Sequence, residues 1–280
     1  MRNVPFGRPM IGDAEKSAVL AVLEGPTLVH GPKSKEFEQL FAGFTGAPHA
    51  VSCSSCTAGM HLVYVAWGLG PGDEVIVPAQ THTATAHAVA LTGATPVFAD
   101  ADPVTGNIDL EDVRARITPA TRAIAVVHYL GRPVEMDPLL ALAREHGLKV
   151  LEDCALAVGT RHDGVHAGVQ GDAGCYSFYP VKHMTTAEGG MVTTRHADLA
   201  DQLRLLRAFC VDRPPGDRSM PGIYDVAGLG YNYRMNELQA ALGVVQIGRV
   251  AEFLAARADN FTRLEAGLAD VEELAVLGTG

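Results

Sequence analysis

Short apolar runs alternate with helix-type patterns along most of the chain. Seven runs rich in β-branched and other apolar residues predict strands, at Ala50–Ser54, Glu74–Pro78, Pro96–Asp100, Arg122–His128, Lys149–Asp153, Gly174–Tyr179 and Gly190–Thr194. Helical patterns lie between and after these runs, near 57–69, 82–93, 109–117, 137–147, 197–209 and 235–269. Strands that are apolar on both faces and separated by helices are typical of βαβ units around a buried, largely parallel sheet. The pattern therefore predicts an α/β fold.

The composition indicates a globular protein with a large core. Hydrophobic residues make up 48% and charged residues 19% of the 280 residues, a balance that excludes a disordered chain. Domains extend to about 250 residues. The length therefore suits one large domain, or one domain and part of a second.

The charge balance favours a small-molecule partner. The chain has 22 basic and 32 acidic residues, a net charge of −10, and no run of Lys or Arg. Proteins that bind nucleic acids carry a basic patch or stripe. We therefore expect no nucleic-acid partner.

Cysteine usage and the distribution of charges bear on location. Five cysteines, an odd number in mostly apolar surroundings, favour a reducing compartment, and Cys53 and Cys56 have no second cysteine pair with which to bind a metal. The first residues lack the apolar segment of a signal peptide. Residues 39–72 carry no charged side chain, but Gly, Ser, Thr, Pro and His interrupt them before an 18-residue apolar run forms. We expect a cytoplasmic protein without a metal site or a membrane partner.

One lysine is a candidate for chemistry. The chain has 17 Arg but only five Lys, and Lys182 directly follows a buried-looking strand, in the segment GCYSFYPVKHMTTAEGG. A desolvated lysine amine titrates downward and becomes a nucleophile that can form a Schiff base with a carbonyl cofactor, which an arginine cannot do. On this segment alone, a solvated lysine in a surface turn is an equally good interpretation.

Two further features favour a cofactor site. Asp153 ends a predicted strand at the carboxyl edge of the sheet, where ligands of α/β proteins collect. A carboxylate there can pair with a protonated pyridine nitrogen, although it could equally cap the next loop. Ser52–Ala58 (SCSSCTA) forms a turn whose amides would present a helix N-terminus to a phosphate. Together with Lys182, these residues predict a site for pyridoxal 5′-phosphate (PLP).

At these residues the chain resembles the DegT-type sugar aminotransferases, which are PLP enzymes of fold type I. The resemblance extends over about residues 5–260, and the lysine stretch with its Glu-Gly-Gly is its most specific part. It implies a mixed, mostly parallel seven-stranded sheet between helices. The matching stretches follow the family's order: SSCTAGMHL (54–62), GPGDEVIVPAQTHTATAHAV (70–89), VHYLGRPVEMD (127–137), LEDCALAVGT (151–160), SFYPVKHMTTAEGG (177–190) and YNYRMNELQAALG (231–243).

The resemblance implies roles for individual residues. Lys182 would form the Schiff base with PLP and then move protons at the substrate carbon, and Asp153 would pair with the ring nitrogen. A contact from the neighbouring subunit would make the protein a homodimer with shared active sites. Thr57, Ala58 and Ser177 would bind the phosphate, and the ring of His82 would stack against the face of the cofactor. Asn232 of the neighbouring subunit would also contact the phosphate.

Two positions and the length depart from the family's pattern. Leu156 stands where Gln or His is common near the ring hydroxyl, and Cys56 stands where the phosphate turn commonly has Gly. Family chains usually continue into a smaller C-terminal domain. We therefore expect residues 1–250 to form the PLP-binding large domain with an N-terminal helical arm, and 251–280 to begin an incomplete C-terminal domain.

The resemblance implies a PLP-dependent aminotransferase that moves an amino group, with L-glutamate as donor, to a keto sugar that is nucleotide-linked. Aminocyclitol aminotransferases and sugar dehydratases belong to the same family, although the dehydratase branch has His where this chain has Lys182. A non-catalytic PLP-binding regulator is the alternative from another class. A nicotinamide dehydrogenase is disfavoured, because no Gly-x-Gly-x-x-Gly turn follows the first strand.

Overall fold

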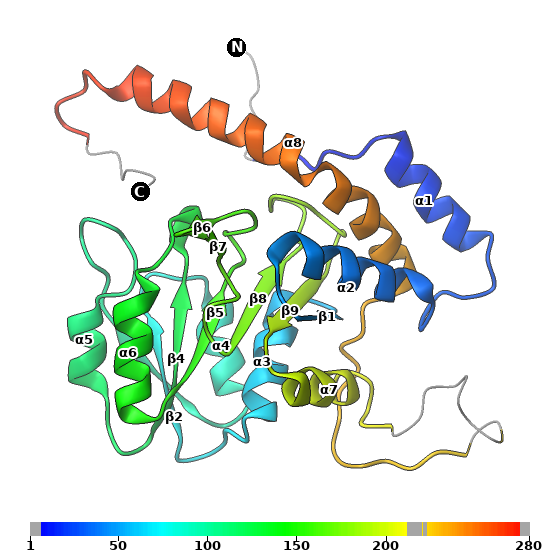
Figure 1. Cartoon of the computed structure of the whole chain (residues 1–280), viewed down its shortest axis with the longest axis horizontal. Helices are drawn as coiled ribbons and strands as arrows, with labels where there is room; N and C mark the ends of the chain where they lie inside the picture. Colours follow the sequence, from blue (N-terminus) through cyan, green and yellow to red (C-terminus); the bar gives the residue numbers. More distant parts are fainter. Residues whose placement is uncertain (1–6, 212–219, 221–222, 275–280) are drawn as a thin grey trace.

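A seven-stranded sheet forms the centre of the protein (Figure 1). The computed structural model describes residues 7–211, 220 and 223–274. Each strand lies within two residues of a predicted one, which confirms the expected α/β fold. In spatial order the strands are β1 (His49–Cys53), β9 (Gly190–Thr194), β8 (Ala173–Ser177), β5 (Lys149–Asp153), β4 (Thr121–Val127), β2 (Glu74–Pro78) and β3 (Thr95–Ala99).

One strand of this sheet runs against the others. β9 pairs antiparallel with both of its neighbours, β1 and β8, whereas the remaining neighbouring strands pair parallel. Six strands therefore end at the same edge of the sheet, and the loops that follow them gather there. In open α/β sheets this carboxyl edge is where ligands bind.

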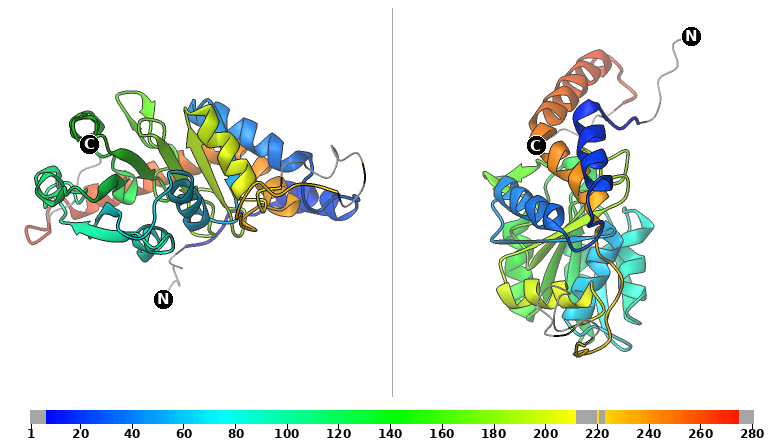
Figure 2. Two further views of the ribbon diagram at one scale, coloured as in Figure 1. Left: turned by 90° about the horizontal axis from the view of Figure 1, so that it is seen from below. Right: turned by 90° about the vertical axis from the view of Figure 1, so that its right-hand side faces the viewer.

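Helices cover both faces of the sheet (Figure 2). One face packs against α3 (Cys56–Ala66), α4 (Thr83–Ala90) and α7 (Ala197–Leu206). The opposite face packs against α5 (Leu110–Arg116) and α6 (Met136–His146) on one half, and against α2 (Pro32–Thr45) and the first part of α8 (Glu237–Leu268) on the other. The remaining helix, α1 (Asp13–Leu23), packs against α8.

Neighbouring residues of a strand point to opposite faces, so each strand contributes to two cores. In β5, Leu151 enters the core beneath α3 and α4, whereas Val150 enters the core beneath α5 and α6. The same alternation continues to the end of the strand. Glu152 therefore lies on the α5–α6 side, and Asp153 lies on the α3–α4 side.

α8 is long and apolar enough, by length and composition, to cross a membrane, with a mean hydropathy of 1.3 over an 18-residue window. Its first half instead packs in a protein core, where Ala240 and Ile247 share a cluster with Phe41 of α2. Glu237 and Gln246 of α8 are also buried and hydrogen-bonded within the protein. These contacts identify this part of α8 as a core helix. The helix is continuous across the boundary expected at residue 250, and that domain division stays a prediction.

One segment expected as a loop contains two short strands. β6 (Arg161–His162) and β7 (Val165–His166) form a small hairpin inside Gly159–Gly174, which we expect to be a loop. A strand of two residues is too short to show an alternating pattern. The proline-rich loop expected at Val211–Gly222 falls mainly outside the described residues.

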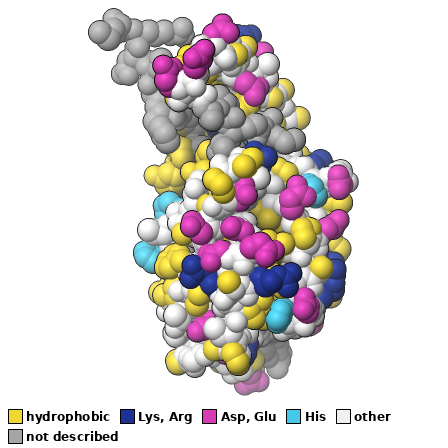
Figure 3. Space-filling view, turned by 90° about the vertical axis from the view of Figure 1, so that its left-hand side faces the viewer, with side chains coloured by type: hydrophobic (Ala, Val, Ile, Leu, Met, Phe, Trp, Pro, Cys, Tyr) yellow, Lys and Arg dark blue, Asp and Glu magenta, His cyan; other side chains and the backbone are white. Residues whose placement is uncertain are grey.

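Charged side chains of both signs mix on the face that carries α5 and α6 (Figure 3). Arg116 pairs with Asp112 within α5, at 2.7 Å, and Arg114 of α5 lies 3.7 Å from Glu145 of α6. Interspersed charges of this kind give the face no continuous basic field.

Candidate active site

Three strand ends bring the predicted site residues to one edge of the sheet. β1 leads from Cys53 into the predicted phosphate turn, β5 ends at Asp153, and β8 ends at Ser177. Gly190 of β9 lies between two of these strands and pairs with both Cys53 and Ser177. This register places the turn after β1 beside the end of β8, which carries the Ser177 hydroxyl.

The turn between β1 and α3 presents free backbone amides. The hydroxyl of Ser55 caps α3 by accepting a hydrogen bond from the amide of Ala58 at 3.0 Å. Among the described residues, the amides of Cys56 and Thr57 have no acceptor. Unpaired amides at a helix N-terminus bind anions. The predicted phosphate contact at Thr57 therefore has a physical basis, whereas the Ala58 amide would have to exchange its Ser55 partner for a phosphate.

The glycines that follow the lysine stretch keep this turn close to the sheet. A Cβ at Gly190 would overlap the backbone of Ser55 and Cys56. A Cβ at Gly189 would overlap the hydroxyl of Thr186. Gly190 thus allows β9 to pass close to the phosphate turn, whereas Gly189 leaves room for the Thr186 side chain.

Asp153 is a buried carboxylate with few partners. Its Oδ2 accepts a hydrogen bond from the Thr85 hydroxyl at 2.8 Å, and its Oδ1 accepts one from the Ala155 amide at 3.0 Å. The Cys56 thiol lies 4.0 Å from Oδ1. Burial raises the pKa of Asp153, and these hydrogen bonds and the positive charge of Lys182 offset the rise only in part. A cation placed beside Asp153 would stabilise its ionised form.

Lys182 lies in the segment that joins β8 to β9, residues 178–189, which we term the lysine loop. Its side chain is half-buried, and its loop leaves β8 at the edge of the sheet where Asp153 lies. The positive charge of Lys182 offsets part of the rise in the pKa of Asp153 that burial causes. In the next residue, His183, burial together with the charges of Arg257 and Lys182 lowers the pKa to about 4. His183 is therefore neutral at pH 7 and adds no charge beside the lysine.

The other two predicted cofactor contacts lie on exposed surface. His82 caps α4, and its Nδ1 accepts a hydrogen bond from the Ala84 amide at 3.1 Å, which fixes the ring at the same edge of the sheet. Asn232 is exposed, and its Oδ1 accepts a hydrogen bond from Arg234 at 2.7 Å. Within the described part of the chain, no hydrogen bond joins Asn232 to Lys182. Its contact with a cofactor from a second subunit stays a prediction.

Sequence reasoning missed two partners of Asp153. Thr85 is fully buried in α4 among apolar neighbours, and a hydroxyl in an otherwise apolar helix face signals a hydrogen-bond partner in the core. We treat Cys56 as a departure in the phosphate turn, but its thiol also faces Asp153. Both residues lie far from Asp153 in sequence, so only the fold reveals the contacts.

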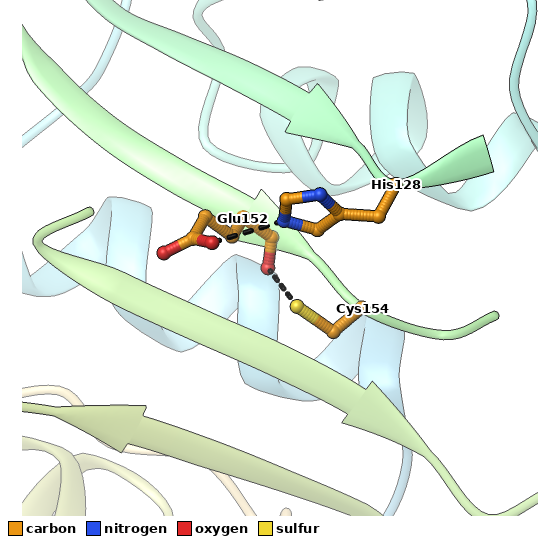
Figure 4. Close-up of side chains that lie close together, drawn as sticks. All are labelled: His128, Glu152 and Cys154. Carbon is orange, nitrogen blue, oxygen red and sulfur yellow. Dashed lines mark hydrogen bonds and ion pairs between the residues drawn. The ribbon is translucent and has the colours of Figure 1, made fainter. Parts of the chain in front are cut away.

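A second buried carboxylate, Glu152, lies on the opposite face of β5 (Figure 4). His128 and Glu152 are fully buried, and Nε2 of the histidine lies 2.9 Å from Oε2 of Glu152. Because Nδ1 of His128 accepts a hydrogen bond from the Val134 amide at 3.1 Å, Nε2 carries the proton and donates to Glu152. Glu152 also accepts hydrogen bonds from three backbone amides, those of Gly168, Gln170 and Gly171.

These hydrogen bonds also explain a cluster with the composition of a metal site. The ligand atoms of His128, Glu152 and Cys154 lie within 4.8 Å of one another. Burial raises the pKa of the Cys154 thiol well above its usual range, and the thiol donates to the backbone carbonyl of Glu152 at 3.7 Å. His128 and Glu152 thus accept hydrogen bonds from protein donors, and the Cys154 thiol keeps its proton, so the cluster is a structural network.

The residues on the Asp153 side fit PLP in their chemistry. The free amides of Cys56 and Thr57 and the hydroxyl of Ser177 suit a phosphate, and the partly satisfied Asp153 suits a protonated ring nitrogen. Lys182 supplies the amine for a carbonyl cofactor. Anion binder, buried acid and amine are all present at one edge of the sheet.

Comparison with known proteins identifies related sequences and structures. The profile of the DegT/DnrJ/EryC1/StrS aminotransferase family matches residues 9–279. The spore coat polysaccharide biosynthesis protein SpsC of Bacillus subtilis is 45% identical over 250 residues, which cover 88% of this chain and 64% of that protein. GDP-perosamine synthase of Caulobacter vibrioides is 48% identical over 222 residues, which cover 79% of this chain and 58% of that enzyme. The chain thus spans less than two thirds of the length of these two relatives.

The fold is also similar to solved structures. An aminotransferase from Psychrobacter cryohalolentis superimposes with a TM-score of 0.91 at 35% identity, over 96% of this chain and 70% of that one. Other matching structures are described as PLP and PMP forms. These matches agree with the fold type and the cofactor expected from the sequence.

Proposed function

Because the chain belongs to the DegT/DnrJ/EryC1/StrS aminotransferase family, we propose that it is a PLP-dependent aminotransferase that acts on a keto sugar. The proposed amino donor is L-glutamate, and the proposed acceptor is nucleotide-linked. The name of the relative GDP-perosamine synthase supports a nucleotide-linked sugar, because that name specifies a GDP-linked product.

One observation carries the proposal. Asp153 ends β5, and the lysine loop that carries Lys182 begins where β8 ends, at the same carboxyl edge of the sheet. The phosphate turn lies at the same edge, at the start of α3. A nucleophilic amine, a buried acid and an anion cradle in one place are the groups that PLP requires.

Each residue has a defined part in the proposed reaction. When bound, PLP supplies an electron sink for negative charge that develops at the carbon carrying the amino group. Lys182 Nζ acts as the base that removes the proton from this carbon and as the acid that returns it. Asp153 keeps a proton on the ring nitrogen, and Thr85 orients the carboxylate that does so. The amides of Cys56 and Thr57 and the hydroxyl of Ser177 anchor the phosphate.

The proposed active enzyme is a homodimer with shared sites. In this proposal, Asn232 from one copy reaches the phosphate in the other. Its exposure supports this role, since an exposed amide is available to a second chain. Arg234 holds the Asn232 side chain through its oxygen, which leaves the amide nitrogen to donate.

The decisive experiment follows the absorbance of the protein with added PLP, before and after addition of L-glutamate. We expect a visible Schiff-base band that converts to the PMP spectrum, with 2-oxoglutarate released in equal amount. D-Glutamate and the Lys182→Ala variant serve as controls and should produce no conversion. A Schiff-base band that never converts with any amino donor would contradict transamination and favour a binding role.

A further inference from the structure

The lysine loop is held along its length by α8. In Figure 1 this helix crosses above the ends of β8 and β9, which the loop connects. Hydrogen bonds join the two segments at three places: Gln239 donates to the carbonyl of Glu188 at 2.7 Å, Gln246 accepts from the amide of Thr185 at 3.2 Å, and Arg257 donates to the carbonyl of Lys182 at 3.1 Å.

The spacing of these three side chains follows the period of a helix. Gln246 lies seven residues after Gln239, and Arg257 lies eleven residues after Gln246. At about 3.6 residues per turn these intervals equal about two and three turns, so all three side chains project from the same face of α8. Along this face the contacts proceed from the end of the loop back to Lys182. The loop and the helix therefore run antiparallel, side by side.

Gln246 is the central and most buried of the three side chains, with 1% of its surface exposed. Its oxygen accepts the hydrogen bond from Thr185, three residues from Lys182. Its amide nitrogen donates to the carbonyl of Met10 at 3.0 Å and to Oε1 of Glu15 at 2.8 Å. One side chain thus joins α8 to the lysine loop and to the N-terminal segment that leads into α1.

Apolar packing does not hold the loop on its α1 side. A cavity of about 510 Å³ lies there, with Val19 and Leu20 of α1 on one wall and Pro180 and Ala187 of the loop on another. Ala187 adopts φ of +67°, in the left-handed region that disfavours a side chain. A strained conformation persists only where other contacts impose it. Here the burial of Phe178 and Met184 in the core and the hydrogen bonds from α8 impose it together.

We propose that Gln246 is a positioning residue for Lys182, assisted by Gln239 and Arg257. By fixing the backbone of the lysine loop, it sets the position of the Lys182 amine at the carboxyl edge of the sheet. The effect on chemistry rests on the proposed function, whereas the effect on the loop is a property of the chain itself.

Hydrogen–deuterium exchange of the protein without cofactor tests the structural part. In Gln246→Met, which keeps the length of the side chain without its hydrogen bonds, we expect exchange in peptides covering 182–188 to rise about fivefold or more, as the loss of one hydrogen bond predicts. In Arg257→Ala the rise should be smaller and centred on Lys182, and Arg257→Lys should restore much of the protection. Arg263→Ala is the matched control, because Arg263 pairs with Asp259 on the same helix.

Equal exchange of the lysine loop in Gln246→Met and the wild type would overturn the proposal, as would a rise spread evenly over the whole chain. Arg257 is exposed, so Arg257→Ala keeps the test decisive if Gln246→Met does not fold. With PLP and donor present, the single-turnover rate should fall in Gln246→Met with little change in the half-saturating donor concentration. If the wild type transfers no amino group but the variants show the expected hydrogen–deuterium exchange, the proposed function is wrong. The role of Gln246 in the loop then still holds.

Discussion

The last two residues of β5 carry carboxylates in opposite surroundings, although they are neighbours on one strand. Glu152 is fully buried and accepts four hydrogen bonds, from His128 and from the amides of Gly168, Gln170 and Gly171. Burial alone would raise its pKa, but these donors outweigh burial and lower it. Asp153 is also buried but has fewer donors, and its pKa is raised.

This difference separates a structural carboxylate from one that is available for chemistry. Glu152 ties the loop at 168–171 to the end of β4, and its lone pairs are occupied. Asp153 accepts hydrogen bonds from Thr85 and Ala155 and lies near the Cys56 thiol, and burial keeps its pKa raised despite these donors. Because neighbouring residues of a strand point to opposite faces, the two adjacent carboxylates lie in different environments.

The largest loss of stability should follow from disrupting the hydrogen-bond network of Glu152. In Glu152→Gln, one side-chain oxygen is replaced by an amide that faces backbone donors, and buried donors lose their acceptor. We expect a loss of about 3–5 kcal/mol in the free energy of unfolding, as for other broken buried pairs. Urea denaturation followed by circular dichroism measures it. A loss below about 1 kcal/mol would show that the network contributes little to stability.

Substitution of Asp153 should instead change the reaction rate and leave stability almost unchanged. In Asp153→Asn, the amide can still accept from Ala155 and can donate to Thr85, so we expect stability within about 1 kcal/mol of the wild type. The donor-driven conversion of bound PLP should slow by about 100-fold or more, because the charged partner of the ring is lost. Stopped-flow absorbance measures the rate. Rapid conversion in this variant would remove Asp153 from the mechanism.

A smaller change tests the orientation of Asp153. Thr85→Val removes the hydroxyl that donates to Oδ2 while keeping the shape of the side chain. A hydrogen bond to a charged group contributes about 1.5–3 kcal/mol, so the conversion rate should fall by at least about tenfold. Thr83→Val, at an exposed position two residues earlier on the same helix, is the control and should leave the rate unchanged. Equal rates in the two variants would argue against this role of Thr85.

The smallest expected difference between Asp153 and Glu152 lies in how each affects the pH dependence of stability. The raised pKa of Asp153 means that the folded protein holds a proton that the unfolded chain releases near pH 4. The resulting destabilisation is complete above the folded pKa and disappears as pH falls below the unfolded value. Asp153→Asn should therefore gain most relative to the wild type near pH 7, and the gain should shrink toward pH 4. A difference that is constant over this range would show that Asp153 is ionised without penalty.

For Glu152 the pKa shift, and therefore its effect on stability, has the opposite sign. Its folded pKa is lowered, so its stabilising contribution is complete above the unfolded value of about 4.3 and is lost as pH falls through the lower folded value. The deficit of Glu152→Gln relative to the wild type should therefore stay constant from pH 7 to pH 5. A deficit that already shrinks in that range would contradict the lowered pKa.

The sheet could be predicted from the sequence because its strands are short, apolar and separated by clear helical patterns. Strand ends and family motifs mark Lys182, Asp153 and the phosphate turn as candidates in the sequence, and their roles stay predictions. The contacts of Thr85 with Asp153, of His128 with Glu152 and of Gln246 with the lysine loop could not be predicted. They join residues far apart in the chain, and a single polar residue in an apolar element signals that a partner exists without identifying it.

The proposed function requires that PLP binds covalently to Lys182 on the Asp153 side of the sheet. The most direct test is borohydride reduction of the PLP-treated protein, followed by mapping of the modified lysine by mass spectrometry. The chain has only five lysines, so the assignment is unambiguous. We predict that the pyridoxyl group is found on Lys182 and is absent from Lys182→Ala. Modification of another lysine, or a trapped cofactor that persists in Lys182→Ala, would show that Lys182 does not bind the cofactor.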